Sequence, residues 1–206
     1  MKKSIGIISD THIYEQKTQI PRKIREAFWD VEYIVHSGDI STPCVLEELQ
    51  KIAPVKAVIG NKFDDNVNFV GILPEILEFN VNGVRILVVH GSSKIESNID
   101  NFIGKDKNIL NLASNLIYLL KHLVKFVGFK RVSNYMLMRR LASKYTGKVD
   151  CIIFGHTHVT YMGYYRNILF LNPGDAQYSH KNKASLIKLT IDTEGKMDPR
   201  LIDLHF

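Results

Sequence analysis

The segment SIGIISDTHIY (residues 4–14) changes abruptly from an apolar run to the polar side chains of Asp10 and His12. Its β-branched first half predicts a strand, and the polar pair follows at the carboxyl end of that strand. Carboxylates and imidazoles are rarely buried without a partner, so these two residues indicate a functional site rather than a core. The apolar run is too short for a secretory signal, and we therefore expect the start of the chain to be part of the fold.

The same pattern of an apolar strand followed by a polar turn recurs twice in the next 50 residues of the chain. Strands are predicted in VEYIVHSGDI (31–40) and VKAVIGNKFD (55–64), which carry a Gly-Asp and a Gly-Asn pair after their apolar residues. Helices are predicted in PRKIREAFWD (21–30) and TPCVLEELQKI (42–52), each with a proline near its start. This alternation predicts a right-handed β-α-β-α-β unit whose neighbouring strands are parallel.

The rest of the chain is richer in predicted strands than in helices. ILEFNVNGVRILVVHG (76–91) has Asn82-Gly83 between two apolar runs, which is a strong hairpin signal. Further strands are predicted in DCIIFGHTH (150–158), NILFLNPGD (167–175) and KASLIKLTIDTEGKMDPRLIDL (183–204). The chain has 206 residues, 45% of them hydrophobic, which suits one core. We therefore expect an α/β fold, a sandwich of sheets flanked by helices, in a single domain of residues 1–206.

Side chains that can bind a metal ion follow five of the predicted strands: Asp10, His12, Asp39, Asn61, His90, His156 and His158. Ligands of α/β sheets collect beyond the carboxyl ends of the strands, so these side chains are expected at one rim. A set of nitrogen and oxygen ligands without sulfur suits divalent manganese, iron, zinc, cobalt or nickel. Seven ligands are too many for one ion. If Asp39 bridges, two ions share it, and each receives four protein contacts.

Each motif taken singly has a structural alternative. A lone DTH or GD can be a cap or a turn, and His90 can be a hydrogen-bonded core histidine. The GHTH segment (155–158) is more specific, because two histidines on a turn after a buried strand have little packing role. Five such strand ends together favour a metal site over five unrelated turns.

The motifs DTH, GD, GN, HG and GHTH, in this order, resemble the calcineurin-like metallophosphoesterases, especially their small prokaryotic phosphodiesterase branch. The resemblance covers about residues 1–91 and 149–206. It implies a four-layer αββα sandwich of two mixed sheets flanked by helices. It implies a first ion held by Asp10, His12, Asp39 and His158, and a second held by Asp39, Asn61, His90 and His156. It also implies that Asn172-Pro173-Gly174 brace the GHTH loop; the family more often continues with serine, where this chain has Asp175.

The activity implied by the resemblance is hydrolysis of a phosphoester by a metal-bound hydroxide, with Asp39, Asn61 and His90 as catalytic residues. The implied cofactors are two divalent metal ions, preferably manganese, with nickel, cobalt, iron or zinc as alternatives. Many phosphomonoesterases of the superfamily have histidine directly after the asparagine, whereas Lys62 follows Asn61 here. We therefore expect a phosphodiesterase rather than a phosphomonoesterase.

The connection between His90 and His156 is longer than in small members of this family, and it predicts a basic helical insertion at about residues 92–148. Residues 107–148 contain nine Lys or Arg and no Asp or Glu, although the formal net charge of the chain is only +6. One helix is expected to present an apolar stripe formed by Ile109, Leu112, Ala113, Leu116, Leu120, Leu123, Val124 and Val127. A second is expected in SNYMLMRRLASKY (133–145), packing through Tyr135, Met138, Leu141, Ala142 and Tyr145.

Three interpretations of this inserted helical hairpin remain open. It can pack over the active-site rim or between the subunits of a homo-oligomer, with its lysines solvated. It can attract a polyanionic substrate, such as a nucleotide or nucleic acid. It can lie on anionic lipid, although its apolar stripe would serve equally well as buried core.

A different class of function is also compatible with the resemblance, since relatives of this fold include interaction scaffolds with a degraded metal site. Retention of all seven ligand residues argues against a scaffold that uses the basic insertion only for binding. No window of the sequence is apolar enough for a transmembrane segment. The two cysteines, Cys44 and Cys151, form no CxxC pair, and a reducing cytoplasmic location is expected.

Overall fold

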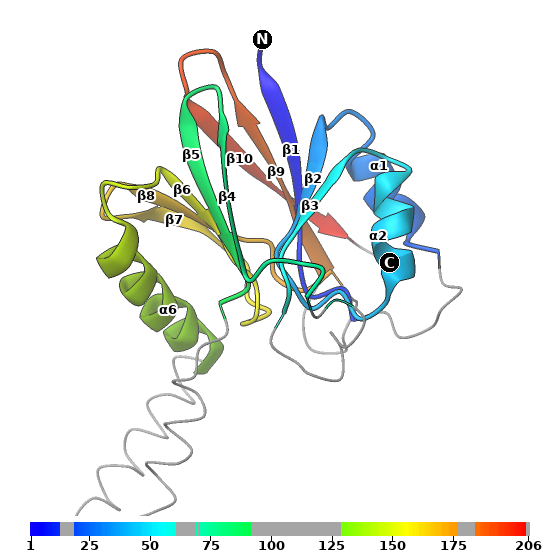
Figure 1. Ribbon diagram of the computed structural model, residues 1–206, viewed down its shortest axis with the longest axis horizontal. Coiled ribbons are helices and arrows are strands. Elements are labelled where there is room, and N and C mark those ends of the chain that lie inside the picture. Colours follow the sequence, from blue (N-terminus) through cyan, green and yellow to red (C-terminus); the bar gives the residue numbers. More distant parts are fainter. Residues whose placement is uncertain (13–18, 61–68, 70, 92–128, 177–183, 205–206) are drawn as a thin grey trace, which may run out of the picture.

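The computed structural model describes residues 1–12, 19–60, 69, 71–91, 129–176 and 184–204, which form two five-stranded sheets packed face to face (Figure 1). The first sheet has the order β10-β9-β1-β2-β3. Its strands are β1 (Lys3–Ile8), β2 (Tyr33–His36), β3 (Val55–Ala57), β9 (Ala184–Ile191) and β10 (Met197–Leu204). Strands β1, β2 and β3 are parallel, as the alternating pattern predicts, while β9 and β10 are antiparallel to their neighbours.

The second sheet has the order β4-β5-β6-β8-β7 and is also mixed. Its strands are β4 (Ile76–Val81), β5 (Val84–Val89), β6 (Cys151–Ile153), β7 (Tyr161–Tyr165) and β8 (Ile168–Asn172). Asn82-Gly83 turns the β4–β5 hairpin at positive φ, as predicted. The sequence pattern did not predict β7, because this edge strand is half-buried on one face and exposed on the other, so its hydrophobic alternation is weak.

Helices cover the outer face of each sheet and complete four layers (Figure 1). The helices α1 (Arg22–Ala27) and α2 (Pro43–Gln50) lie on the first sheet, and both are shorter than predicted. Helix α6 (Phe129–Tyr145) lies on the second sheet. The expected αββα sandwich of two mixed sheets is therefore confirmed. No helix in the described ranges is long and apolar enough to cross a membrane.

Helix α6 is the second of the two helices predicted in the insertion, and the first lies outside the described residues. Met138, Leu141, Ala142 and Tyr145 are buried against the second sheet, as expected. Tyr135 was expected to pack but is 53% exposed, because its position on the helix points away from the sheet surface that Leu137 covers instead. Its ring makes an edge contact with Tyr165 of β7, with 6.1 Å between ring centroids.

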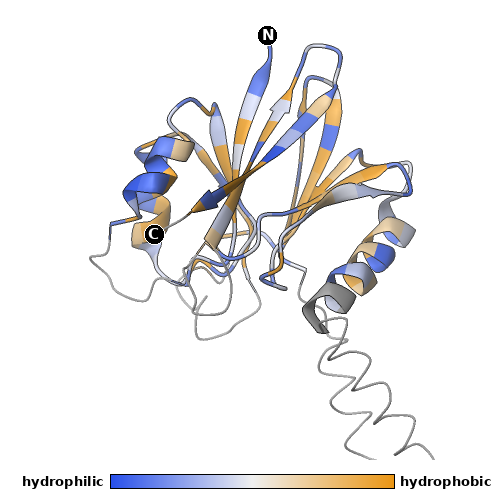
Figure 2. Ribbon diagram, turned by 180° about the vertical axis from the view of Figure 1, so that it is seen from behind, coloured by the Kyte–Doolittle hydropathy of each residue, from blue (hydrophilic) through white to orange (hydrophobic). Residues whose placement is uncertain are grey.

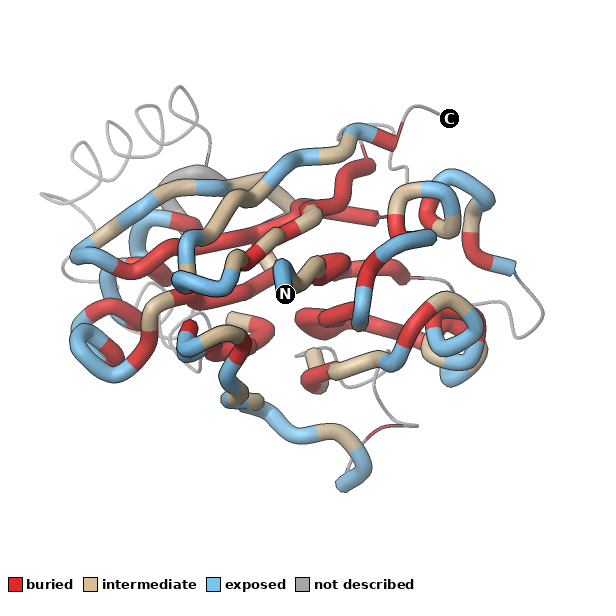
Figure 3. The backbone as a smooth tube through the Cα atoms, turned by 90° about the horizontal axis from the view of Figure 1, so that it is seen from above, coloured by how far each residue is buried: buried red, intermediate tan, exposed pale blue. Residues whose placement is uncertain are grey.

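The three interfaces between the four layers are apolar (Figure 2), and the residues that form them are buried (Figure 3). Strand β1 shows how one strand serves two of them: Ile5 and Ile7 face the second sheet, whereas Ile8 faces the helices α1 and α2. Each of these side chains is fully buried and contributes about 1.5–3 kcal/mol by leaving water. The packing fixes both sheets in one orientation, so the carboxyl ends of β1, β2, β5 and β6 open at the same end of the sandwich (Figure 1).

Candidate metal centre

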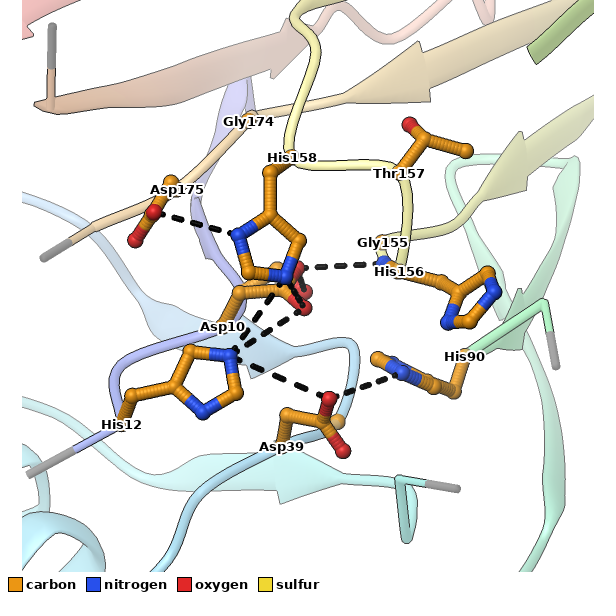
Figure 4. Close-up of polar contacts among 12 residues, drawn as sticks. Asp10, His12, Asp39, His90, Gly155, His156, Thr157, His158, Gly174 and Asp175 are labelled. Atoms are coloured by element: carbon orange, nitrogen blue, oxygen red, sulfur yellow. Dashed lines mark hydrogen bonds and ion pairs between the residues drawn. The ribbon is translucent and has the colours of Figure 1, made fainter. Parts of the chain in front are cut away.

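Four of the predicted ligand residues converge at this end of the sandwich (Figure 4). One nitrogen or oxygen atom from each of Asp10, His12, Asp39 and His158 lies within 4.8 Å of the others. The residues come from the loops after β1, β2 and β6, so the group spans both sheets. Three of the four residues are buried, so these potential metal ligands face one another away from bulk water.

The backbone at most of these residues is left-handed, which is unusual for residues other than glycine. The φ angles are positive at Asp10 (52°), His12 (44°), Asp39 (54°), His156 (71°) and His158 (56°). Such a conformation costs roughly 1–2 kcal/mol per residue and persists only where the surroundings impose it. Here the Asp10 N–H donates to the Gly38 carbonyl at 3.0 Å, which ties the DTH turn to the GD turn. Left-handed turns of this kind bring side chains two positions apart, such as Asp10 and His12, to one point.

Glycines allow the loops to approach the two carboxylates closely. A Cβ atom on Gly60 would lie 1.8 Å from Asp39 Oδ1, and one on Gly155 would lie 2.0 Å from Ser9 Oγ. No side chain fits at either position without moving the carboxylate or its neighbour. Glycine is therefore required at these positions of the GN and GHTH motifs, because a Cβ atom would come too close to the neighbouring side chains.

Asp10 is buried, and its two carboxylate oxygens have different surroundings. Oδ2 accepts hydrogen bonds from Ser9 Oγ at 2.6 Å and from the His156 N–H at 3.1 Å. Oδ1 is buried and accepts no hydrogen bond from the described residues, although His158 Nε2 lies 3.3 Å away. A buried carboxylate oxygen without a donor costs about 1–3 kcal/mol or more. A divalent cation bound by Asp10, His12, Asp39 and His158 would remove that cost, so these residues fit a metal ion.

Hydrogen bonds at Nδ1 direct the opposite nitrogen of two histidines toward the carboxylates. His158 Nδ1 lies 3.1 Å from Asp175 Oδ2, and His90 Nδ1 lies 2.8 Å from the Ser37 carbonyl oxygen. Both acceptors require a proton on Nδ1. The free electron pair of each neutral ring is therefore on Nε2. His90 Nε2 lies 3.3 Å from Asp39 Oδ2. This is the arrangement that metal-binding histidines generally adopt.

The electrostatics of the site favour a positive charge. Burial opposes the charged form of His90, but the Asp39 and Asp10 carboxylates outweigh burial and raise the pKa of this histidine. Two buried carboxylates therefore attract a cation at the position of the His90 ring nitrogen. A divalent ion would supply the same charge without protonating the imidazole.

Two further histidines, His90 and His156, lie beside this group. The His90 and His156 rings meet edge to face with 5.3 Å between centroids, and His90 reaches Asp39 as described above. Asn61, the remaining predicted ligand, lies outside the described residues. The structure thus brings six of the seven predicted residues to one end of the sandwich, arranged on both sides of Asp39 (Figure 4).

His36 is a buried link between two of the ligand loops. The Gly38 N–H donates to His36 Nδ1 at 3.2 Å, and His36 Nε2 lies 3.3 Å from Thr11 Oγ1. Burial is the main cause that lowers the pKa of His36 to about 3, so the ring is neutral. Its contacts with Thr11 and Gly38 show that it supports the DTH and GD turns.

The GHTH loop is held from behind by a buried polar network. Asn172 Nδ2 donates to the Gly155 carbonyl at 3.1 Å and to Thr157 Oγ1 at 2.9 Å, which confirms the expected bracing role of the LNPGD segment. Thr157 Oγ1 in turn donates to Asn134 Oδ1 at 2.6 Å, and Asn134 Nδ2 donates to the Val159 carbonyl at 3.0 Å. Helix α6 therefore contacts the loop that carries two predicted ligands.

The sequence analysis missed Asn134, although a signal for it was present. It lies four positions before Met138 and seven before Leu141, on the buried stripe of α6. A polar side chain on an apolar stripe requires a buried partner, which here is the GHTH loop.

A two-sheet α/β sandwich that gathers carboxylates and imidazoles beyond the ends of its strands is the arrangement expected of a metal-dependent phosphoesterase. The model of the calcineurin-like phosphoesterase superfamily domain matches residues 3–194. The chain belongs to this superfamily.

Relatives and solved structures agree with that assignment. A probable metallophosphoesterase of Methanocaldococcus jannaschii, MJ0623, is 32% identical over 203 residues, which cover 98% of this chain and 81% of the relative. The phosphodiesterase MJ0936 of the same organism is 26% identical over 174 residues, which cover 83% and 82%. The structure of Vacuolar Protein Sorting 29 from Cryptosporidium parvum has the same fold, with a TM-score of 0.59 and 18% identity over 98% of each chain.

We predict that His36 makes the folded state sensitive to acid. Its pKa rises from about 3 in the folded state to the usual 6.5 on unfolding. The stabilisation is therefore complete above pH 6.5 and is lost as the pH falls toward 3, by up to about 1.4 kcal/mol per pH unit. Urea unfolding of metal-free protein between pH 7 and pH 4 should show a shallower slope in His36→Asn, whose amide cannot titrate. Equal slopes in the two proteins would contradict the prediction.

We predict that Asn134→Ala destabilises the protein by about 1–3 kcal/mol, because Thr157 and the Val159 carbonyl lose a buried partner. The measurement is urea unfolding, together with hydrogen exchange of the amides at residues 155–159. Ser143→Ala is the matched control, since it removes an exposed hydroxyl from the same helix. The two variants should differ both in stability and in exchange at the loop, and equal behaviour would count against the network.

Proposed function

We propose that the protein is a dinuclear metal-dependent phosphodiesterase. The observation that carries the proposal is the position of Asp39 between two groups of donors, with Asp10, His12 and His158 in one group and His90 and His156 in the other. Two ions that share one carboxylate would account for both groups. Asn61 would complete the second group. Manganese suits this mixture of oxygen and nitrogen ligands.

When bound, two adjacent divalent ions lower the pKa of water, polarise the phosphoryl oxygen and align the attacking and leaving oxygens. The protein contributes preorganisation. Asp39 fixes the spacing of the two groups, and the Nδ1 hydrogen bonds of His90 and His158 hold their Nε2 atoms in place. Because the left-handed turns are imposed by the fold, the donors need little rearrangement during the reaction.

The relatives support hydrolysis, and one of them supports the preference for diesters. The 26%-identical relative is named a phosphodiesterase, and Lys62 occupies the place where phosphomonoesterases of the superfamily have histidine. A second candidate function is an interaction scaffold, which the fold similarity to Vacuolar Protein Sorting 29 favours. The left-handed backbone at five ligand residues argues for the enzyme, since binding through the outer surface gives no reason to keep that strain.

The exposed face of α6 supports a polyanionic substrate, such as a nucleic acid. Three exposed cations, Arg139, Arg140 and Lys144, lie along this face, and a fourth, Lys148, follows in the turn after the helix. None of them has an ion pair within the described residues, whereas Lys3, Arg25, Arg85 and Lys188 elsewhere are paired. The apolar side chains of α6 are mostly buried against the second sheet, which disfavours insertion into lipid. The negative charge of a phosphodiester chain would complement the cations of α6, and its phosphodiester bonds would be the substrate of the proposed metal site.

We predict that manganese restores hydrolysis of bis-p-nitrophenyl phosphate to protein treated with a chelator, with slower hydrolysis of p-nitrophenyl phosphate. Asp39→Asn should lower the diester rate by more than about 100-fold, because one change removes a negative charge from both groups of donors. Asp198→Asn is the control, since this carboxylate is exposed on β10. If metal-loaded wild-type protein hydrolyses no phosphoester in a broad panel, the enzyme is ruled out and the scaffold candidate takes its place.

We predict that binding of a single-stranded oligonucleotide weakens with salt, with a logarithmic slope of about −3 for four phosphate contacts. Replacing Arg139, Arg140, Lys144 and Lys148 by glutamine should reduce the slope and lower oligonucleotide cleavage relative to that of the small diester. The measurements are fluorescence anisotropy and cleavage at two salt concentrations.

The matched control replaces four exposed cations elsewhere by glutamine: Lys2, Arg22, Lys51 and Arg200. Both variants carry the same change in net charge, so a general field effect would alter them equally. An equal salt slope in the two variants would exclude the α6 face as the binding surface.

A further inference from the structure

Asp175 follows the LNPGD turn and contacts one of the predicted metal ligands from outside the group. Its Oδ2 lies 3.1 Å from Nδ1 of His158, on the far side of the ring from Asp10 (Figure 4). His158 Nε2 lies 3.3 Å from Asp10 Oδ1. The imidazole is thus held between two carboxylates, one inside the candidate metal group and one behind it.

His158 is the ligand of the group with the weakest support from packing. Its side chain is 22% exposed, compared with 6% for His12, 0% for Asp10 and 1% for Asp39. Its backbone is left-handed with a φ of 56°, as it is at the other three residues of the group, so exposure is what distinguishes His158 from them. A side chain at the edge of a site can turn to other rotamers unless a specific contact prevents it. The bond to Asp175 is such a contact.

Asp175 itself is held firmly enough to act as a fixed point. The residue is 3% exposed, and the Ser185 N–H donates to its backbone carbonyl at 3.0 Å. The following residue, Ala176, donates its N–H to the Ser9 carbonyl at 3.2 Å. Ser9 directly precedes Asp10. The two carboxylates that contact the His158 ring are therefore both held at the carboxyl end of β1, Asp10 by the chain itself and Asp175 through the bond between Ala176 and Ser9.

We propose that Asp175 is a positioning residue that fixes the orientation and the protonated nitrogen of His158 and thereby strengthens the ion held by Asp10, His12, Asp39 and His158. The inference rests on the metal site of the proposed function. A carboxylate at this position also adds negative charge behind the ring, which makes Nε2 a better donor to a cation. The hydroxyl that the family more often has here would provide neither the charge nor the reach of the longer side chain.

The experiment compares metal binding by wild-type protein, Asp175→Asn and Asp175→Ser. Binding of manganese to metal-free protein is measured by titration calorimetry, and the absorption spectrum of bound cobalt reports its coordination. We expect Asp175→Ser to weaken one of two binding steps by about 10–100-fold and to leave the other unchanged. Asp175→Asn retains an acceptor for Nδ1 but loses the charge, so its loss should be intermediate and its cobalt spectrum should resemble that of the wild type.

Two further variants calibrate these values. His158→Ala removes the ligand and sets the largest loss expected at the same step. Asp198→Asn removes an exposed carboxylate on β10 and should bind both ions as the wild type does.

The outcomes separate positioning from a purely structural role. Wild-type affinity for both ions in Asp175→Ser would overturn the proposal. Equal weakening of both steps in Asp175→Asn and Asp175→Ser, together with equal loss of thermal stability in the metal-free proteins, would also overturn it, because the carboxylate would then only support the fold.

The proposed function fails in a different way. If the wild type binds two ions but hydrolyses no phosphoester, the enzyme is excluded while the effect of Asp175 on binding is still measured. If the wild type binds no ion, both proposals fail at the same step, and the calorimetry of the wild type alone reveals this.

Discussion

The constraint on which this structure depends is the burial of two carboxylates, Asp10 and Asp39, at the junction of two sheets. Like charges in a region of low dielectric repel one another, and each must also give up its hydration. The surrounding imidazoles and backbone N–H groups offset part of this cost, yet Asp10 Oδ1 still accepts no hydrogen bond from the described residues. A bound cation resolves the remaining conflict. The rest of the molecule forms a frame that holds the two carboxylates in place.

That frame has two parts, which act at different ranges. The parallel strands β1, β2 and β3 and the parallel strands β5, β6 and β8 bring the loops to one end of the sandwich. The turns then act locally, through left-handed backbone at the ligand residues and through Gly60 and Gly155, which approach Asp39 and Ser9 closely. The strands bring the ligand residues near one another, and the turns orient their side chains. Neither is sufficient alone, because the ligand residues lie in the turns beyond the strand ends rather than in the strands themselves.

The sequence was informative where a feature is local or repeats. Strand ends with polar residues predicted the convergence of Asp10, Asp39 and His90, because in α/β sheets the polar residues beyond the carboxyl ends of strands converge on one rim. The contacts of Asn134 with Thr157, and of Asp175 with His158, were not predictable, since they depend on how α6 and the LNPGD turn pack against a loop distant in the chain. Tyr135 shows the same limit. Helical periodicity places it near the apolar stripe, but in the packed structure Leu137 is buried and Tyr135 is 53% exposed.

The position of α6 also constrains how this chain could have changed over time. Asn134 fills the space behind the GHTH loop, and Leu137 lies so close to Gly91 that a Cβ atom there would be 2.6 Å from its side chain. Residues of α6, which lie between the HG and GHTH motifs in the sequence, therefore pack against both motifs. A shortened gene lacking this helix would expose polar atoms that now have buried partners. Any lineage that discarded it would first need replacement groups for Thr157 and Asn172, so the helix cannot be deleted without repair of the GHTH loop.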